Sequence, residues 1–398
     1  MTLFSRPNSV LAYCLILLIS YFLAGCSSDE KKEEPAELED FSEELSIKRL
    51  WRSSVGSGFD DHYLFLQPIY TADYIYAIDF NGELSLFSKA DGDDIWEYDL
   101  NELVSAGLGF DGENLYYATL NGELVALGLT PAAVLANDKS AEPVKELWRA
   151  PLSSEAVAPP QSNGRIVVVQ TVDGRVAAFD KNTGASNWVY QSNEPVLSLR
   201  GTATPFINEE VTVTGFANGE LVQLDNTTGT PFWQHSVALP QGRTELERLV
   251  DIDGKVGFLD RTLYSVAYQG NMQAIDLYSG QELWSKSGSS YVQVEQDFAL
   301  VYIAASNGDV IALDRITRSE AWVQPALKYR RLTPVISFGS VVAVGDFEGY
   351  LHFLSKSDGR FVGRVRVDSD GLRVPMHVDG STLYVFGNGG TLAAYSIE

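Results

Sequence analysis

Residues 173–188 read Asp-Gly-Arg-Val-Ala-Ala-Phe-Asp-Lys-Asn-Thr-Gly-Ala-Ser-Asn-Trp, and they contain one complete copy of the motif that fills most of the chain. The Asp-Gly pair is a typical hairpin turn, and the alternation behind it predicts a half-buried β-strand. A second small turn, Thr183-Gly184, then leads to Trp188, which lies 14 residues after the first glycine. The motif predicts strands joined by tight turns, with the tryptophan on the last strand.

A glycine followed by an alternating apolar segment recurs eight times, and every tryptophan of the chain has the same phase in this repeat. The turn glycines are Gly82, Gly122, Gly174, Gly219, Gly270, Gly308, Gly349 and Gly390. The tryptophans are Trp51, Trp96, Trp148, Trp188, Trp233, Trp284 and Trp322. A scattered set of core aromatics would not share one phase, so the pattern indicates a true structural repeat.

Three units depart from the pattern. The second has a 12-residue insertion in the loop around 130–146, because Trp148 lies 26 residues after Gly122. The sixth has Arg318 where four other units have a glycine four residues before the tryptophan. The seventh has Gly363 at the tryptophan position, and we expect Phe361 to substitute for the ring.

The period of the repeat predicts the architecture. The 348 residues from Trp51 to Glu398 give 43.5 residues for each of eight units, a length typical of four-stranded propeller blades. The last unit lacks its tryptophan strand, and a tryptophan strand at 48–54 precedes the first complete unit. Pairing these fragments would close the ring without an open edge. The sequence therefore predicts an all-β protein, an eight-bladed β-propeller over 47–398. We expect four antiparallel strands per blade, with the N-terminal strand outermost in the last blade.

The N-terminus has the features of a targeting segment. Arg6 precedes an apolar run over 10–23, which is shorter than a membrane span and typical of a signal peptide. The run ends in Leu23-Ala24-Gly25-Cys26, which resembles the bacterial lipobox. We therefore expect a signal peptide at 1–25 and a lipid on Cys26. The alternative is a plain secretory signal with an incidental cysteine. By analogy with sorting rules, Ser27 favours the outer membrane.

Residues 26–46 are predicted to be an acidic, flexible tether. Asp29 to Glu44 contains nine acids and two lysines and few apolar residues, a composition that cannot bury a core. An acidic docking segment is the alternative.

Composition argues against several function classes. The 398 residues have a net charge of −24, which disfavours nucleic-acid binding. Loss of Cys14 with the signal and lipidation of Cys26 would leave no disulfide and no thiolate metal site. The four histidines lack ligand spacing, and neither a phosphate loop nor a nucleophile elbow is present. We therefore expect no enzyme activity, no cofactor and no metal.

One basic patch stands out against this acidic background. It comprises Lys328, Arg330, Arg331, Arg360, Arg364 and Arg366. The patch either contacts an acidic partner or a lipid headgroup, or it offsets surface charge.

The repeat resembles that of quinoprotein alcohol dehydrogenases, in which an Asp-x-x-Thr-Gly turn precedes a tryptophan, as in 180–188 here. That resemblance implies a propeller fold. Members of that class bind pyrroloquinoline quinone and calcium and often use a vicinal cysteine pair. The sequence offers no such pair after loss of the signal and no distinctive calcium cluster, so the fold is expected without the chemistry.

Nearly the whole chain more closely resembles the family of outer-membrane protein assembly factor BamB. The resemblance covers the lipobox, the acidic segment, the eight repeats and the stretch Val-Gly-Asp-Phe-Glu-Gly-Tyr-Leu-His at 344–352. Two further segments, Leu-Ser-Leu-Arg-Gly at 197–201 and Leu-Val-Asp-Ile-Asp at 249–253, look like the family's partner-binding loops. The resemblance implies contact with the periplasmic domains of the insertase subunit BamA. The implied contact residues are Leu197, Leu199, Arg200, Asp251 and Asp253.

The repeat phase places these two segments together independently of the resemblance. Arg200 lies 19 residues before Gly219, and Asp251 lies 19 residues before Gly270, so both should enter consecutive blades at one level. They should therefore be neighbours on one face of the ring. The alternative is that the leucines alternate into a strand core and the aspartates flank a turn at Gly254.

The function expected from these observations is that of a scaffold lipoprotein in outer-membrane β-barrel assembly. We expect it on the periplasmic side of the outer membrane, held by lipid alone, and also able to meet unfolded client proteins. The alternatives are a quinone- and calcium-dependent oxidoreductase and a generic envelope binding module.

Overall fold

The computed structural model of the protein describes residues 33–60, 62–131, 141–195, 197–199 and 201–398. Residues Pro35–Glu398 form one compact unit. Cys26 and the predicted signal peptide lie outside the described residues, as does Arg200. Within the described ranges, no helix is long and apolar enough to cross a membrane.

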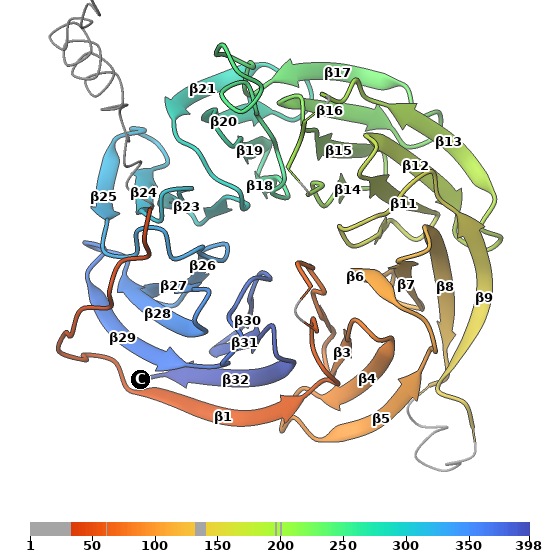
Figure 1. The fold of residues 1–398 in the computed structure, drawn as a ribbon, viewed down its shortest axis with the longest axis horizontal. Helices are drawn as coiled ribbons and strands as arrows, with labels where there is room; N and C mark the ends of the chain where they lie inside the picture. Colours follow the sequence, from red (N-terminus) through yellow and green to blue (C-terminus); the bar gives the residue numbers. More distant parts are fainter. Residues whose placement is uncertain (1–32, 61, 132–140, 196, 200) are drawn as a thin grey trace, which may run out of the picture. The chain divides into compact units, whose positions relative to one another are not determined.

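The unit is a ring of eight antiparallel sheets with four strands each (Figure 1). The strands of the first two blades are β2 (Ile69–Tyr70), β3 (Tyr74–Ile78), β4 (Glu83–Ser88), β5 (Asp94–Asp99), β6 (Val104–Phe110), β7 (Asn114–Thr119), β8 (Glu123–Leu129) and β9 (Val144–Pro151). Those of the third and fourth are β10 (Gln161–Ser162), β11 (Ile166–Thr171), β12 (Arg175–Asp180), β13 (Ser186–Gln191), β14 (Phe206–Ile207), β15 (Val211–Gly215), β16 (Glu220–Asp225) and β17 (Pro231–Ser236). Those of the fifth and sixth are β18 (Gly257–Leu259), β19 (Thr262–Val266), β20 (Asn271–Asp276), β21 (Glu282–Ser287), β22 (Glu295–Gln296), β23 (Leu300–Ala304), β24 (Val310–Asp314) and β25 (Glu320–Gln324). Those of the seventh and eighth are β26 (Ile336–Phe338), β27 (Val341–Gly345), β28 (Tyr350–Ser355), β29 (Phe361–Arg366), β30 (His377–Asp379), β31 (Thr382–Phe386), β32 (Thr391–Ile397) and β1 (Ile47–Ser54).

The ring closes as the sequence predicts. In the eighth blade the strand order is β1-β32-β31-β30, and β1 pairs antiparallel with β32 from Ile47↔Ile397 to Ser54↔Thr391. Figure 1 shows this pair side by side, with the first strand beside the last. The eight-bladed propeller and the closing N-terminal strand are both confirmed.

Each tryptophan lies on the outermost strand of its blade, also as predicted. Most of them also contact the next blade. Five indole nitrogens donate to a backbone carbonyl one blade further on: Trp51 to Lys89 (3.3 Å), Trp148 to Lys181 (2.7 Å), Trp188 to Asn226 (2.8 Å), Trp233 to Leu277 (2.9 Å) and Trp322 to Lys356 (2.8 Å). The same rings lie on glycines of that next blade, namely Gly92, Gly184, Gly229, Gly280 and Gly359. A Cβ at Gly184 would lie 2.5 Å from the ring of Trp148, so only glycine permits this contact.

The contact between a tryptophan and the next blade differs in the irregular units. Arg318 occupies the glycine position in the sixth blade with a φ of 64°, and among the described residues Trp284 makes no comparable hydrogen bond. The second blade carries the predicted insertion between β8 and β9, although β9 already begins at Val144. The buried indole nitrogen of Trp96, which faces that blade, has no partner among the described residues.

The expectation that Phe361 replaces the missing ring is wrong. Gly363 pairs with Phe353 in the register that pairs Trp322 with Ala312 one blade earlier, so Gly363 takes the tryptophan position. A Cβ there would lie 2.7 Å from Cδ1 of Ile47, which fills the space. The physical reason is that β32 and β1 are not consecutive in the chain. The eighth blade therefore has no outer turn on which a tryptophan could dock.

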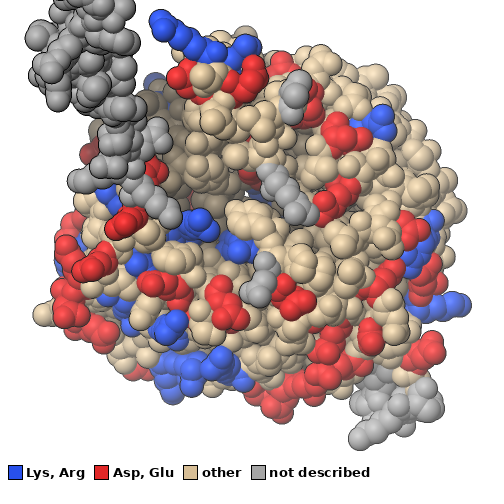
Figure 2. Space-filling view, in the orientation of Figure 1, with Lys and Arg blue, Asp and Glu red and all other residues tan. Residues whose placement is uncertain are grey.

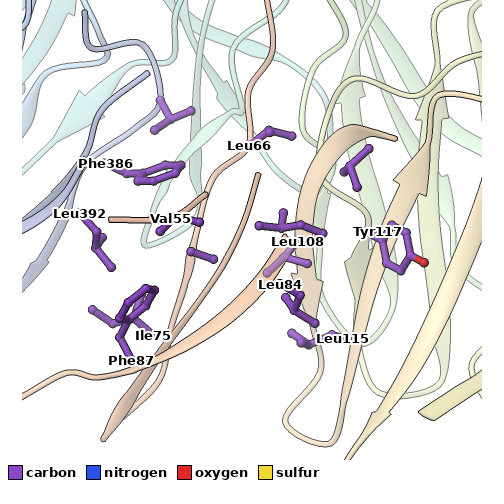
Figure 3. Close-up of a cluster of buried hydrophobic side chains, with 14 of the residues drawn as sticks. Val55, Leu66, Ile75, Leu84, Phe87, Leu108, Leu115, Tyr117, Phe386 and Leu392 are labelled. Atoms are coloured by element: carbon purple, nitrogen blue, oxygen red, sulfur yellow. The ribbon is translucent and has the colours of Figure 1, made fainter. Parts of the chain in front are cut away.

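Apolar side chains between neighbouring blades form the core. Figure 3 shows Val55 and Leu66 of the connection into the first blade, and Ile75 of β3, in one cluster with Phe386 and Leu392 of the eighth blade. All five are no more than 1% exposed. The core thus crosses the seam where the ring closes and stabilises the closure in addition to the β1–β32 hydrogen bonds.

Residues 35–46 differ from the predicted flexible tether. They lie against the seventh blade, where Glu44 and Leu45 donate backbone hydrogen bonds to the Val362 carbonyl and Phe41 stacks on Phe361. The physical reason is that the few apolar residues in this segment pack on apolar surface of the blade, and its acids lie against the basic patch. We call residues 35–46 the strap.

Candidate functional site

One face of the ring carries all eight connections between blades. Since each blade has four antiparallel strands, the chain enters and leaves every blade on the same face. We call it the connection face, and its segments are 55–68, 100–103, 152–160, 192–205, 237–256, 288–294, 325–335 and 367–376. The Asn-Gly and Asp-Gly turns that mark the repeat lie on the same face, whereas the glycines under the tryptophans lie on the opposite one.

The two predicted partner-binding segments meet on this face. They belong to the connections 192–205 and 237–256, which enter the fourth and fifth blades. A Cβ added at Gly201 would lie 2.3 Å from Oδ1 of Asp253, so the side chain of Asp253 lies directly against the backbone of Gly201. The backbone N–H of Leu199 donates a hydrogen bond to the carboxylate of Asp251. The neighbourhood expected from the repeat phase is therefore present in the structure.

The predicted site residues differ in how far they reach the surface. Leu197 is 40% exposed and belongs to no strand, which rules out the alternative of a leucine alternating into a strand core. Leu199 and Asp253 are half-buried, whereas Asp251 is only 2% exposed. Asp251 also forms a β-bridge with Tyr268. It therefore positions the neighbouring connection rather than offering its carboxylate to a partner.

The carboxylates in this junction lie in an environment that disfavours their charge. Oδ2 of Asp251 and Oδ1 of Asp253 are buried without a hydrogen-bond partner among the described residues. Burial raises the pKa of both groups, and their mutual repulsion raises the pKa of Asp251 further. A cationic group near this junction would relieve that cost.

Sequence reasoning missed a third acid in the junction. Glu194 lies in the same connection as Leu199, its Oε1 is buried without a partner among the described residues, and burial raises its pKa. Its charge also raises the pKa of Asp251. No repeat position or motif marks this glutamate in the sequence, because connections between blades do not follow the periodic pattern.

The ring axis brings further connections together. Tyr63 lies within electrostatic range of Arg373, Asp253 and Arg331, which come from three other connections. The guanidinium of Arg373 lies 4.3 Å from the centre of the Tyr63 ring and donates to the His62 carbonyl. Figure 2 shows Lys and Arg side chains beside the hollow at the centre of the ring, although the net charge of the chain is −24. The carboxylate of Asp253 lies near the same central tyrosine as Arg373 and Arg331.

Apolar side chains also remain uncovered on this face. Leu239 is 64% and Leu246 is 70% exposed, and both belong to the connection that contains Asp251. Exposed leucines beside charged groups are typical of a protein–protein contact, in which an apolar anchor is surrounded by polar residues. The arrangement can bind a protein surface.

The comparisons with known proteins agree with this architecture. A family model described as "Outer membrane protein assembly factor BamB" matches residues 80–324. The BamB protein of Pseudomonas aeruginosa is 42% identical over 387 residues, which cover 97% of this chain and 99% of that protein. The crystal structure of BamB from Moraxella catarrhalis superposes with a TM-score of 0.78 at 27% identity, covering 88% of this chain and all of that one.

The quinohemoprotein alcohol dehydrogenase of Comamonas testosteroni shares the fold alone. It superposes with a TM-score of 0.67 at 12% identity and covers 88% of this chain and 76% of its own. The extended similarity in sequence is instead to the assembly factors. The chain belongs to the family of outer membrane protein assembly factor BamB.

Proposed function

We propose that this protein is a non-catalytic scaffold of the outer-membrane β-barrel assembly complex and that it binds the periplasmic domains of BamA. The observation that carries the proposal is the junction of the connections 192–205 and 237–256 on one face. In a chain of this family, that junction presents an exposed leucine beside a charged cluster. The role of the scaffold is to hold the insertase domains, and to contact unfolded client proteins, while client barrels are inserted.

The residues of the junction have different roles in this proposal. Leu197 provides the apolar contact because it is the most exposed of the candidates. Leu199 and Asp253 border the contact, and Asp251 holds the two connections together through the Leu199 N–H. Arg200 stays a predicted contact, since it lies outside the described residues.

We further propose that the protein is held at the periplasmic side of the outer membrane by a lipid on Cys26. Its domains are then a signal peptide at 1–25, a lipidated tether that begins at Cys26 and a propeller over 47–398. Metabolic labelling with a radioactive fatty acid tests this arrangement. Label that persists in a Cys26→Ser variant would overturn it.

The partner contact is tested by co-purification from detergent-solubilised envelopes. The Leu197→Glu and Arg200→Glu variants should each recover at least tenfold less BamA than the parent chain. Leu283→Glu is a matched control, because Leu283 is similarly exposed but lies on the outer strand β21. If both site variants recover as much BamA as the parent chain, the proposed contact site is wrong. Asp251→Asn is preferable to a charge reversal there, since a buried arginine would disturb the fold.

The alternatives make different predictions. A quinoprotein oxidoreductase would take up pyrroloquinoline quinone and calcium with a change in absorbance. Among the described residues, however, no group of three or more His, Cys, Asp or Glu side chains is placed to hold a metal ion. A generic envelope binding module would recover peptidoglycan or unrelated proteins in the same pull-down. The Leu197→Glu substitution would not change that recovery.

A further inference from the structure

The strap covers a built site on the outer edge of the seventh blade. Its aromatic residue, Phe41, stacks on the ring of Phe361, with centroids 5.5 Å apart and 28° between planes. The guanidinium of Arg364 lies beside both rings, 4.9 Å from the centre of Phe41 and 5.4 Å from that of Phe361. The backbone carbonyl of Glu39 accepts a hydrogen bond of 3.1 Å from Arg364. One arginine therefore contacts both the aromatic side chain and the backbone of the strap.

Acidic residues of the strap meet the basic patch. Arg360 donates to both carboxylate oxygens of Glu44, with distances of 3.1 Å and 2.8 Å. Such paired geometry is selective for a carboxylate. At the other end of the strap, Arg330 donates to the Ala36 carbonyl at 2.8 Å, and the Ala36 N–H donates to the Lys328 carbonyl at 2.9 Å. Four of the six patch residues, Lys328, Arg330, Arg360 and Arg364, thus contact the strap.

Apolar contacts fix the register of the strap between these polar ends. Leu38 packs against the cluster that contains Trp322, and Leu45 packs against the core between the seventh and eighth blades. Val362, whose carbonyl accepts the two backbone hydrogen bonds, is 3% exposed. Leu147 and Leu283, which also directly precede the tryptophan position on their outer strands, are 46% and 47% exposed. The strap therefore covers an edge that other blades leave open.

We propose that this edge is a binding site for an extended acidic peptide with a central aromatic residue, and that the strap occupies it in an exchangeable manner. The recognition elements are the contacting Phe361–Arg364 pair for the aromatic ring, Arg360 for a carboxylate three residues later, and the Val362 carbonyl for the backbone. The site does not depend on the proposed contact with BamA.

The strength of the contacts favours exchange. The Arg360–Glu44 pair is about half exposed on each side, and such pairs contribute little and are screened by salt. Ordering a twelve-residue segment carries a large entropy cost that these contacts must offset. Two of the strap's backbone hydrogen bonds go to β29, and the others join Ala36 to Lys328 and Ser46 to Glu398, so the strap does not pair with β29 as a full strand would.

A labelled synthetic peptide of residues 35–46 tests the site with the full chain. Fluorescence anisotropy should show weak binding to the wild-type chain, whose site is occupied. Binding should be at least tenfold tighter to a Phe41→Ala, Glu44→Gln chain, whose own strap is weakened, and it should fall as salt rises. Adding Arg360→Gln and Arg364→Gln to that chain should abolish binding. Adding Arg175→Gln, an exposed arginine of the third blade, should leave it intact.

Two outcomes would overturn the proposal. One is peptide binding that is no tighter to the strap variant than to the wild-type chain. The other is binding that survives the loss of both arginines. A Phe41→Ala peptide, measured against the same strap-weakened chain, gives a readout that does not depend on whether a further protein variant folds. It should bind at least tenfold more weakly than the parent peptide, and equal binding would also overturn the proposal.

Discussion

The indole nitrogen of Trp148 in the second blade donates a hydrogen bond of 2.7 Å to the carbonyl oxygen of Lys181 in the third. The ring also lies on Gly184, whose φ of 69° is one that favours glycine. Hydrogen bond and ring contact together join two blades that share no strand pairing. The repeated tryptophan therefore connects neighbouring blades, which explains why its phase in the repeat is invariant.

Trp148→Phe should destabilise the protein by about 2 kcal/mol, because it removes a buried hydrogen bond and leaves a small cavity. Trp284→Phe should cost less than about 1 kcal/mol, since Trp284 makes no such bond among the described residues and lies opposite Arg318. Urea unfolding monitored by circular dichroism measures both. Equal losses in the free energy of unfolding for the two variants would contradict this role of Trp148.

Arg318→Gly should stabilise the protein by about 0.5–1 kcal/mol. A non-glycine residue at a φ of 64° is strained, and relief of that strain should exceed the added chain entropy of glycine. Glu320→Gly, two residues later within β25, is the control and should destabilise by about 0.5–1 kcal/mol. If both variants lower the urea midpoint, the backbone at Arg318 is not strained.

The contribution of His352 to stability should fall as the pH drops below about 6.5, the unfolded pKa of histidine, whereas the buried acids Asp251, Asp253 and Glu194, whose pKa is raised, contribute with the opposite sign. Burial lowers the pKa of His352 despite its hydrogen bond to Asp346, so the unfolded chain binds the additional proton first. Burial alone would raise the pKa of Asp346, but hydrogen bonds from His352 and Arg330 lower it overall, which adds a further loss below about 4. Compared with the parent chain, His352→Gln should therefore lower the urea midpoint less at pH 5.0 than at pH 7.5, so the difference between the two chains should shrink on acidification. An unchanged difference would show that another group is responsible.

Gly201→Ala should weaken BamA recovery at least tenfold while the fold is retained. The new Cβ would meet Oδ1 of Asp253 at 2.3 Å, so the side chain of Asp253, one of the proposed contacts, would have to move. Gly288→Ala is a suitable control, because the nearest atom to its Cβ would lie 3.8 Å away. Normal recovery with Gly201→Ala would mean that the close approach does not shape the contact surface.

The propeller could be predicted from the sequence because its features are local and periodic. Turn glycines, alternating strands and the tryptophan phase each repeat, so eight weak signals reinforce one another. The meeting of the 197–201 and 249–253 segments followed from the same periodicity. The packing at Gly363 did not follow from the periodicity, because it depends on contact with Ile47, which lies more than 300 residues away in the sequence.

Other parts of the site could not be predicted because burial there depends on irregular connections. Asp251 looks like a surface residue in the sequence, and only the approach of Leu199 and Tyr268 makes it buried. The strap was missed for a related reason. Its acidic composition predicts a solvated chain, and composition does not reveal the arginines that lie opposite in the fold.

The pairing of β1 with β32 has a consequence for how the protein forms. The first strand of the ring is synthesised long before its partner, so β1 must wait unpaired until nearly the whole chain exists. Contacts between residues this far apart in sequence form slowly, and an unpaired strand edge is prone to aggregate in the meantime. A chain that ends before Thr391, the first residue of β32, would lose the β1 partner and remain an open ring. Ring closure thus distinguishes finished chains from unfinished ones.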